Sequence, residues 1–151
     1  MRIYADTSVF GAYFELGVDV PTRRLFDMFA RGQARLVLSD ITVSELAGAP
    51  PRIRELPDTI SPQYVERIGA PPEADALAAL YLQEGIMRPS MSVDALHIAT
   101  AVVARVDVLV SWNFRDFVNP RKIDGYNLIN LRLGYSVIDI RDPGKVILHE
   151  R

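Results

Sequence analysis

The sequence SMSVDALHIATAVVARVDVLVSWNFRDF, residues 90–117, decides the fold because it predicts a buried helix that leads directly into a buried strand. The predicted helix has a wide apolar face made by Leu96, Ile98, Ala99, Ala101, Val102 and Val103. Ser90 or Ser92 is expected to cap its start. The apolar run at 108–110 is typical of a strand covered on both faces of a parallel sheet. Polar and aromatic residues follow at once, and sites in α/β sheets gather outside the carboxyl ends of strands.

Composition places the chain among globular cytoplasmic proteins. Its 151 residues make about one domain, because domains commonly run ~100–150 residues, and 49% hydrophobic content excludes a disordered chain. The sequence has neither an apolar run of the ~18 residues needed to span a bilayer nor the start of a signal peptide. The absence of cysteine favours the reducing cytoplasm and excludes thiolate metal sites. A net charge of −2 excludes nucleic-acid binding by bulk positive charge, so such binding would need a local patch or a metal ion.

Predicted strands and helices alternate along the chain. We expect strands at residues 2–5, 35–39 and 108–110, an edge strand at 64–68 and a last strand at 135–140. Helices are expected at 22–30, 41–47, 71–84 and 120–133, the last of them interrupted at Gly125, and a short helix or turn at 52–56. A turn and a weakly held tail are expected after residue 141. The apolar stripe at Leu25, Phe26, Met28 and Phe29 is interpreted as core. The pattern predicts one α/β domain over residues 1–151 with a central, mainly parallel sheet.

Acidic residues follow the predicted strands at equivalent positions. Asp6 comes directly after the first strand, and Glu45 lies in the helix after the second. Asp94 opens the helix before the strand at 108–110, and Asn113 and Asp116 leave that strand's end. Right-handed crossovers put the carboxyl ends of parallel strands at one edge, so these side chains are expected to meet there. Carboxylates that meet in a low dielectric repel one another, which favours a bound cation.

Each acid also has a simpler local explanation. Asp6 could cap a helix that begins at Thr7, Asp94 could complement a helix dipole, and Glu45 could face solvent. Asn113 could be a turn residue that ends the strand, and Asp116 could be a cap. The joint placement of the acids is what favours a functional site.

The predicted metal is a hard cation, Mg²⁺ or Mn²⁺, because the chain offers carboxylates and only two histidines, His97 and His149. His97 lies in an apolar helix one turn beyond Asp94 and is interpreted as a hydrogen-bonded structural residue. Thr7 and Ser8 are expected to close the helix entry, or to hydrogen-bond a metal-bound water or the carboxylate of Asp6.

Four segments together resemble the PIN-domain nuclease family, which includes the VapC toxins of toxin–antitoxin pairs. In the family's order they are YADTSV at 4–9, LSDITVSEL at 38–46, DALHIATA at 94–101 and LVSWNFRDF at 109–117. The resemblance implies a three-layer α/β/α fold and metal-dependent cleavage of RNA. It matches Asp6, Glu45 and Asp94 to the family's core acids. Asn113 stands where many members carry a fourth acid, so Asp116 close by is the candidate substitute.

From these residues we expect a metal-dependent endoribonuclease, a hydrolase. Asp6, Glu45 and Asp94 would hold one Mg²⁺ or Mn²⁺, while Asn113 and Asp116 orient water or complete a weaker second site. The RNA backbone is expected to contact basic residues, namely Arg52, Arg54, Arg115, Arg121 and Lys122. The simpler explanation of each, taken alone, is an ordinary solvated surface residue. Trp112 or Phe114 could stack a base or pack in the core. The family also implies a homodimer and a VapB-like antitoxin.

Two other classes of protein remain open from the sequence. The first is a non-catalytic PIN-fold module that binds nucleic acid or protein through a degenerate metal site. The second is a phosphoacceptor receiver domain, which also gathers acids at strand ends. A receiver normally has an acidic pair after its first strand and a lysine at the end of a late strand. Here Asp6 stands alone after the first strand, and Lys122 lies well past the last loop, so this class is disfavoured.

Overall fold

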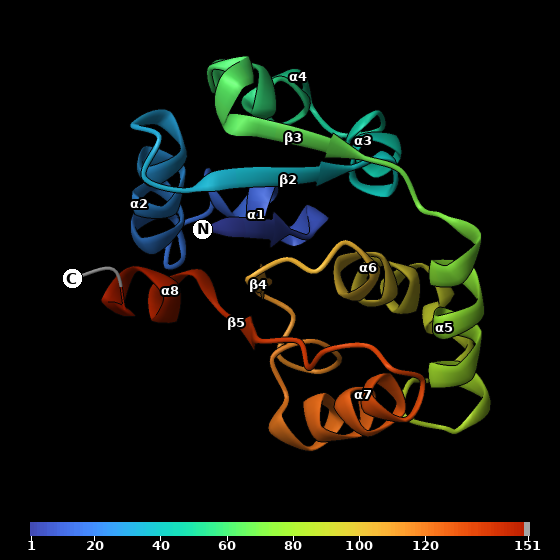
Figure 1. The fold of residues 1–151 in the computed structure, drawn as a ribbon. Coiled ribbons are helices and arrows are strands. Elements are labelled where there is room, and N and C mark those ends of the chain that lie inside the picture. The colour runs from blue at the N-terminus through green and yellow to red at the C-terminus, as the bar shows by residue number, and fades with distance from the viewer. Residues whose placement is uncertain (150–151) are drawn as a thin grey trace.

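The computed structural model describes residues 1–149 and has a five-stranded parallel sheet at its centre (Figure 1). The strands are β1 (Arg2–Ala5), β2 (Arg35–Ser39), β3 (Val65–Ile68), β4 (Val108–Val110) and β5 (Ile140–Arg141), in the order β3-β2-β1-β4-β5. Ile3 of β1 is aligned with Leu36 of β2 and with Val108 of β4. This order differs from the 2-1-3-4-5 order of receiver domains, so the receiver interpretation is wrong.

Eight helices connect and cover these strands over residues 1–149. They are α1 (Thr7–Ala12), α2 (Asp19–Ala30), α3 (Asp40–Leu46), α4 (Pro51–Arg54), α5 (Pro72–Gln83), α6 (Ser92–Val103), α7 (Pro120–Arg132) and α8 (Pro143–His149), with short 3₁₀ turns at Leu56–Thr59, Pro62–Tyr64 and Pro89–Met91. None of the helices in these residues is long and apolar enough to cross a bilayer.

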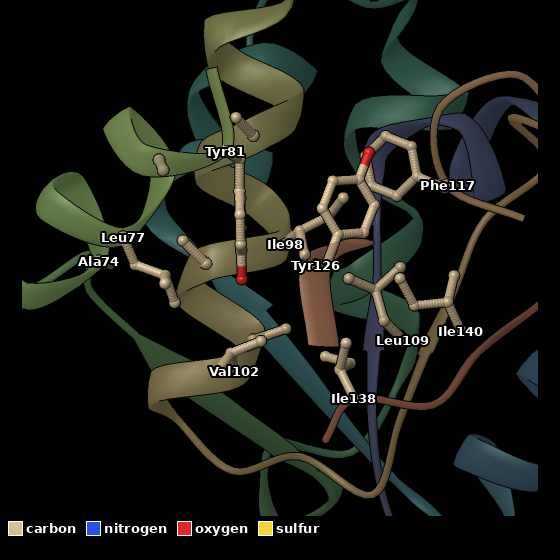
Figure 2. Packing of buried hydrophobic residues seen from close by; sticks show 14 of the residues in the cluster. Ala74, Leu77, Tyr81, Ile98, Val102, Leu109, Phe117, Tyr126, Ile138 and Ile140 are labelled. Atoms are coloured by element: carbon tan, nitrogen blue, oxygen red, sulfur yellow. The ribbon is translucent and has the colours of Figure 1, made fainter. Parts of the chain in front are cut away.

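Alternating strand residues divide the core into two halves, which makes the fold three-layered. On one face, Tyr4, Leu109 and Ile140 pack with side chains of α5, α6 and α7. Figure 2 shows this half, with Tyr81 and Val102 on the helical side of the cluster. On the other face, strand residues such as Ile3 and Val108 pack with α1, α2 and α8. The predicted α/β/α architecture is therefore confirmed, and the predicted apolar stripe Leu25, Phe26, Met28 and Phe29 is buried in the second half.

The end of the chain differs most from the prediction. The last strand is only Ile140–Arg141, and the residues after it form helix α8 instead of a weakly held tail. Val146 of α8 is 2% exposed, because it packs into the same half of the core as α2. Since this contact joins segments more than a hundred residues apart, no local pattern indicated it.

Smaller differences concern helix boundaries. Helix α2 begins at Asp19 and not at residue 22, because Pro21 fits the first turn, where its missing N–H costs no hydrogen bond. Helix α7 is continuous at Gly125, where a Cβ atom would lie 3.0 Å from the side chain of Ile86, so the glycine allows close packing. The cap predicted for α6 at Ser90 or Ser92 is wrong. The cap position is Met91, and its side chain makes no capping hydrogen bond.

Candidate functional site

Two of the predicted acids, Asp6 and Glu45, come after the carboxyl ends of β1 and β2, which point the same way in Figure 1, and electrostatic effects link both acids to Asp94. Asp6 directly follows β1, and its backbone N–H donates to the carbonyl of Val110 at 3.1 Å, which ties it to the end of β4. Glu45 lies in α3, the helix that follows β2. Asp94 lies in the first turn of α6. The sheet topology thus brings together residues that are far apart in the sequence.

Asp6 is a buried carboxylate, and the capping explanation for it is wrong. It occupies the cap position of α1, but its side chain accepts no capping hydrogen bond. Its Oδ1 instead accepts a hydrogen bond from the hydroxyl of Ser8 at 2.6 Å, and the Ser8 oxygen accepts the backbone N–H of Trp112 at 3.1 Å. Burial raises the pKa of Asp6 to about 6, against the opposing effects of Ser8 and His97. An ionised Asp6 is therefore costly unless a positive charge comes near.

Glu45 is partly exposed but is held by two donors. Its Oε1 accepts a hydrogen bond from the hydroxyl of Thr7 at 2.5 Å and lies 2.6 Å from Nε2 of His97. The His97 hydrogen bond lowers the pKa of Glu45, burial acts against it, and the Thr7 bond adds to it. The prediction that His97 is hydrogen-bonded is confirmed. Glu45 is thus an anchored carboxylate, not a freely solvated one.

Asp94 interacts electrostatically with each of the other three carboxylates, those of Asp6, Glu45 and Asp116. Burial raises its pKa, and repulsion from Asp116 and Glu45 raises it further, while His97 and Arg88 oppose this. Asp94 in turn raises the pKa of Asp6. These mutual effects mean that the carboxylates of Asp6, Glu45 and Asp116 all lie within electrostatic range of Asp94. A favourable interaction with the dipole of α6, the simpler explanation of Asp94, does not account for this repulsion.

Asn113 and Asp116 are occupied by other interactions. The Asn113 Oδ1 accepts the backbone N–H groups of residues 115 and 116, each at 3.0 Å, which is the role of a turn residue. Asp116 does not cap α7, whose cap is Asn119. Its buried carboxylate lies 2.7 Å from Nζ of Lys122 and 3.6 Å from a guanidinium nitrogen of Arg88. The negative charge of Asp116 is therefore already compensated within the protein.

The carboxylate oxygens of this site suit a cation that keeps several of its waters better than a cation bound by protein ligands alone. Among the side chains that the structure describes, no three His, Asp or Glu side chains converge closely enough to hold a metal ion directly. The available oxygens are nevertheless those that Mg²⁺ prefers, and Mg²⁺ usually keeps several waters while one or two carboxylates bind it. Both hydrogen bonds to Glu45 fall on Oε1, which leaves Oε2 available. A cation here would also relieve the repulsion around Asp94.

The predicted RNA-contact residues differ in their contacts within the protein. Lys122 is paired with Asp116, and the Arg52 guanidinium lies 4.6 Å from the ring centre of Phe14. The remaining candidates, Arg54, Arg115 and Arg121, are exposed.

The two aromatic candidates also differ. Trp112 is fixed by a hydrogen bond from its ring N–H to the hydroxyl of Thr22 at 2.9 Å and packs at the edge of the core. Phe114 is 55% exposed.

Two residues at this edge were missed by sequence reasoning. Tyr4 reads as an ordinary strand residue, but its hydroxyl lies 2.6 Å from Nδ1 of His97. Arg88 lies in a loop before Pro89, forms an ion pair with Asp116 and lowers the pKa of Asp94. The alternation of side chains along the first strand could have placed Tyr4 on the face of the sheet that α6 covers, whereas no local pattern indicates Arg88.

Comparison with known proteins bears on the fold. No family model matches the sequence, and the comparison with curated proteins finds no match either. Among solved structures, the chain is similar to VapC20 of Mycobacterium tuberculosis, described as a toxin that cleaves the sarcin-ricin loop. The TM-score is 0.55 at 16% identity, over 74% of this chain and 92% of that chain. The chain has the fold of the VapC toxins.

A second VapC-like match covers nearly the whole chain. It is VapBC2 of Rickettsia felis bound to a DNA fragment from their promoter, with a TM-score of 0.55 and 13% identity over 93% of this chain and 98% of that chain. The resemblance to PIN-domain nucleases found in the four sequence segments is thus confirmed at the level of the VapC-like fold. At such low identity the likeness establishes the fold, and the chemistry depends on the site residues.

Proposed function

We propose that this chain is a metal-dependent endoribonuclease that hydrolyses phosphodiester bonds in RNA, and that it is the toxin of a type II toxin–antitoxin pair. The observation that carries this proposal is the group of carboxylates around Asp94, at the edge of a VapC-like sheet where Asp6 and Glu45 also lie. VapC20, which shares the fold, is described as a toxin that cleaves the sarcin-ricin loop. This description supports RNA as the substrate class.

Asp6, Glu45 and Asp94 would hold one Mg²⁺ or Mn²⁺, directly or through water. Such an ion, when bound, supplies positive charge to the scissile phosphate and makes water a stronger acid. Ser8 and Thr7 keep the carboxylates of Asp6 and Glu45 in place through their hydroxyl groups. The charge of Asp116 is already compensated by Lys122 and Arg88, so Asp116 would not form a second metal site.

Exposed basic residues give the RNA backbone its contacts in this proposal. Arg115 follows the end of β4 and Arg121 lies in the first turn of α7, and both side chains are exposed. Phe114, exposed beside Arg115, is available to stack a base. Because the whole chain carries a net charge of −2, these local contacts are expected to bind RNA weakly without the metal ion.

The partners follow from the same proposal. VapBC2 was solved with a DNA fragment from the promoter of its own genes, which supports a VapB-like antitoxin for this chain as well. The antitoxin would cover the acidic edge and block access of RNA. We also propose a homodimer that acts in the cytoplasm.

The test compares Asp94→Asn with Asp75→Asn, which changes an exposed acid in the first turn of α5, a helix of the same length. Calorimetry with Mn²⁺ and cleavage of a structured RNA are measured for both variants and the wild type. Loss of Mn²⁺ binding and cleavage in Asp94→Asn, with both kept in Asp75→Asn and cleavage abolished by EDTA, supports the proposal. Wild-type protein that binds no Mn²⁺ at millimolar concentration would instead favour a non-catalytic binding module. The observation on the side of this alternative is that the described side chains form no group of three metal ligands.

A further inference from the structure

His97 is a buried histidine with both ring nitrogens in use. It is 1% exposed, and its Nδ1 lies 2.6 Å from the hydroxyl of Tyr4. Its Nε2 lies 2.6 Å from Oε1 of Glu45. Tyr4 is itself fully buried in β1, so the ring connects the middle of the sheet to a carboxylate at its edge.

The same chain of hydrogen bonds begins at the start of the helix that carries Glu45. The backbone N–H of Thr42 donates to the Ser39 hydroxyl oxygen at 3.2 Å, in the N-terminal cap of α3. The Ser39 oxygen lies 2.7 Å from the Tyr4 hydroxyl. The bonds therefore run from α3 through β1 and α6 and return to Glu45 on α3.

The direction of the last bond follows from the charges. A bare Nε2 would point its lone pair at a carboxylate oxygen 2.6 Å away, which is repulsive, so Nε2 must carry a hydrogen. In a neutral ring Nδ1 is then an acceptor, and the single hydrogen of Tyr4 points at it. The Ser39 hydroxyl can in turn donate to Tyr4, because the Thr42 N–H already donates to Ser39.

We propose that His97 is a positioning residue: oriented by Tyr4, it holds Oε1 of Glu45 together with Thr7, so that Oε2 stays available to the cation. Glu45 needs such support because its side chain is 38% exposed on a seven-residue helix and would otherwise sample several rotamers. Hydrogen-bond partners that orient metal ligands commonly change metal affinity by 10–100-fold when removed. The inference deepens the proposed function and rests on it.

The first experiment measures Mn²⁺ affinity by calorimetry on folded, full-length variants. We expect His97→Ala to weaken binding by about 10-fold or more, and His97→Gln, whose amide can donate from a similar position, to stay within about 3-fold of the wild type. Tyr4→Phe should weaken binding less than His97→Ala, because the ring remains but is less well oriented. Its matched control is Tyr81→Phe, which removes the hydroxyl of a fully buried tyrosine in the same half of the core. That hydroxyl is bonded to Asn130 of α7 and takes no part in the hydrogen bonds that reach Glu45, so the affinity should stay unchanged.

The second experiment needs no metal. Long-range proton–nitrogen NMR spectra are simple here because the chain has only two histidines, and His97→Gln assigns the signals. We expect a hydrogen on Nε2 of His97 in the wild type. The opposite tautomer, with a bare Nε2, would overturn the inference, as would wild-type Mn²⁺ affinity in a folded His97→Ala.

The outcomes separate the two proposals. Wild-type protein that binds no Mn²⁺ and cleaves no RNA refutes the nuclease, and the positioning role fails with it. Wild-type protein that binds Mn²⁺ and cleaves RNA, with unchanged affinity in the His97 and Tyr4 variants, refutes only the positioning role. Should His97→Ala fail to fold, the comparison of Tyr4→Phe with Tyr81→Phe decides, because equal affinities in that pair overturn the inference.

Discussion

Replacing Asp6 by asparagine should stabilise the metal-free protein at alkaline pH while abolishing metal binding. Asp6 is 5% exposed, and burial raises its pKa from 3.8 to about 6. Asparagine has nearly the same shape, keeps an acceptor for the hydroxyl of Ser8, and carries no charge. The substitution therefore removes mainly the cost of ionising a buried carboxylate.

The magnitude and sign follow from proton linkage. Because the folded chain binds this proton more tightly than the unfolded chain, folding loses stability as pH rises from about 4 to about 6. Above pH ~6 the loss of stability is complete and amounts to about 3 kcal/mol, because each tenfold change in the proton affinity of the carboxylate corresponds to about 1.36 kcal/mol. At pH 4.5 the expected loss is only about 1 kcal/mol. The benefit of Asp6→Asn should therefore be about 2 kcal/mol larger at pH 8 than at pH 4.5, or ~4–8 °C in Tm for a chain of this size.

The assay is urea or thermal unfolding of wild type and Asp6→Asn in EDTA at pH 4.5 and pH 8. Comparing the two pH values cancels any pH-independent effect of the new amide, such as an unpaired N–H. Addition of Mn²⁺ at pH 8 should then stabilise the wild type and not the variant. A difference between the two proteins that is the same at both pH values would refute the reasoning, since Asp6 would then ionise without cost.

Three further predictions concern the ion, its neighbours and the end of the chain. The protein should bind one Mn²⁺ per chain by calorimetry, because Asn113 and Asp116 are occupied, and two ions would contradict this. Lys122→Met should lower the unfolding free energy measured in urea by about 2–3 kcal/mol, because the buried carboxylate of Asp116 then keeps Arg88 as its remaining cationic partner. Adding Asp116→Asn to the Lys122→Met chain should restore part of that free energy. Val146→Ala should cost about 1–2 kcal/mol in urea, and no change would mean that α8 is weakly held.

Much of the fold was predictable because its determinants are local. The apolar run at 108–110, the strand at 35–39 and the helix of residues 92–103 each carry a periodicity that a short window contains. Helix α8 was missed because Val146 is buried by α2, a partner that its neighbours in sequence do not reveal. The strand predicted over 135–140 was too long because only Ile140 and Arg141 pair with β4.

The positions of the candidate residues relative to the strands were predictable, and their interactions were less so. Asp6, Glu45 and Asp94 stand in recognisable positions relative to strands, and sheet topology alone brings such positions to one edge. Whether a carboxylate is free, anchored or already paired depends on distant side chains. Glu45 is held by His97, 52 residues away, and Asp116 is paired with Arg88 from another loop.

The order of residues was enough to specify a three-layer α/β/α domain with acids at one edge of its sheet, because strand and helix periodicity and the handedness of crossovers are properties of short segments. Folding in three dimensions was needed to establish which acids bear an uncompensated charge, that Asn113 serves a turn, and that Tyr4 and His97 support Glu45. The physical reason is that burial and hydrogen-bond geometry arise between segments far apart in the chain, where the identity of a residue does not indicate what it will touch.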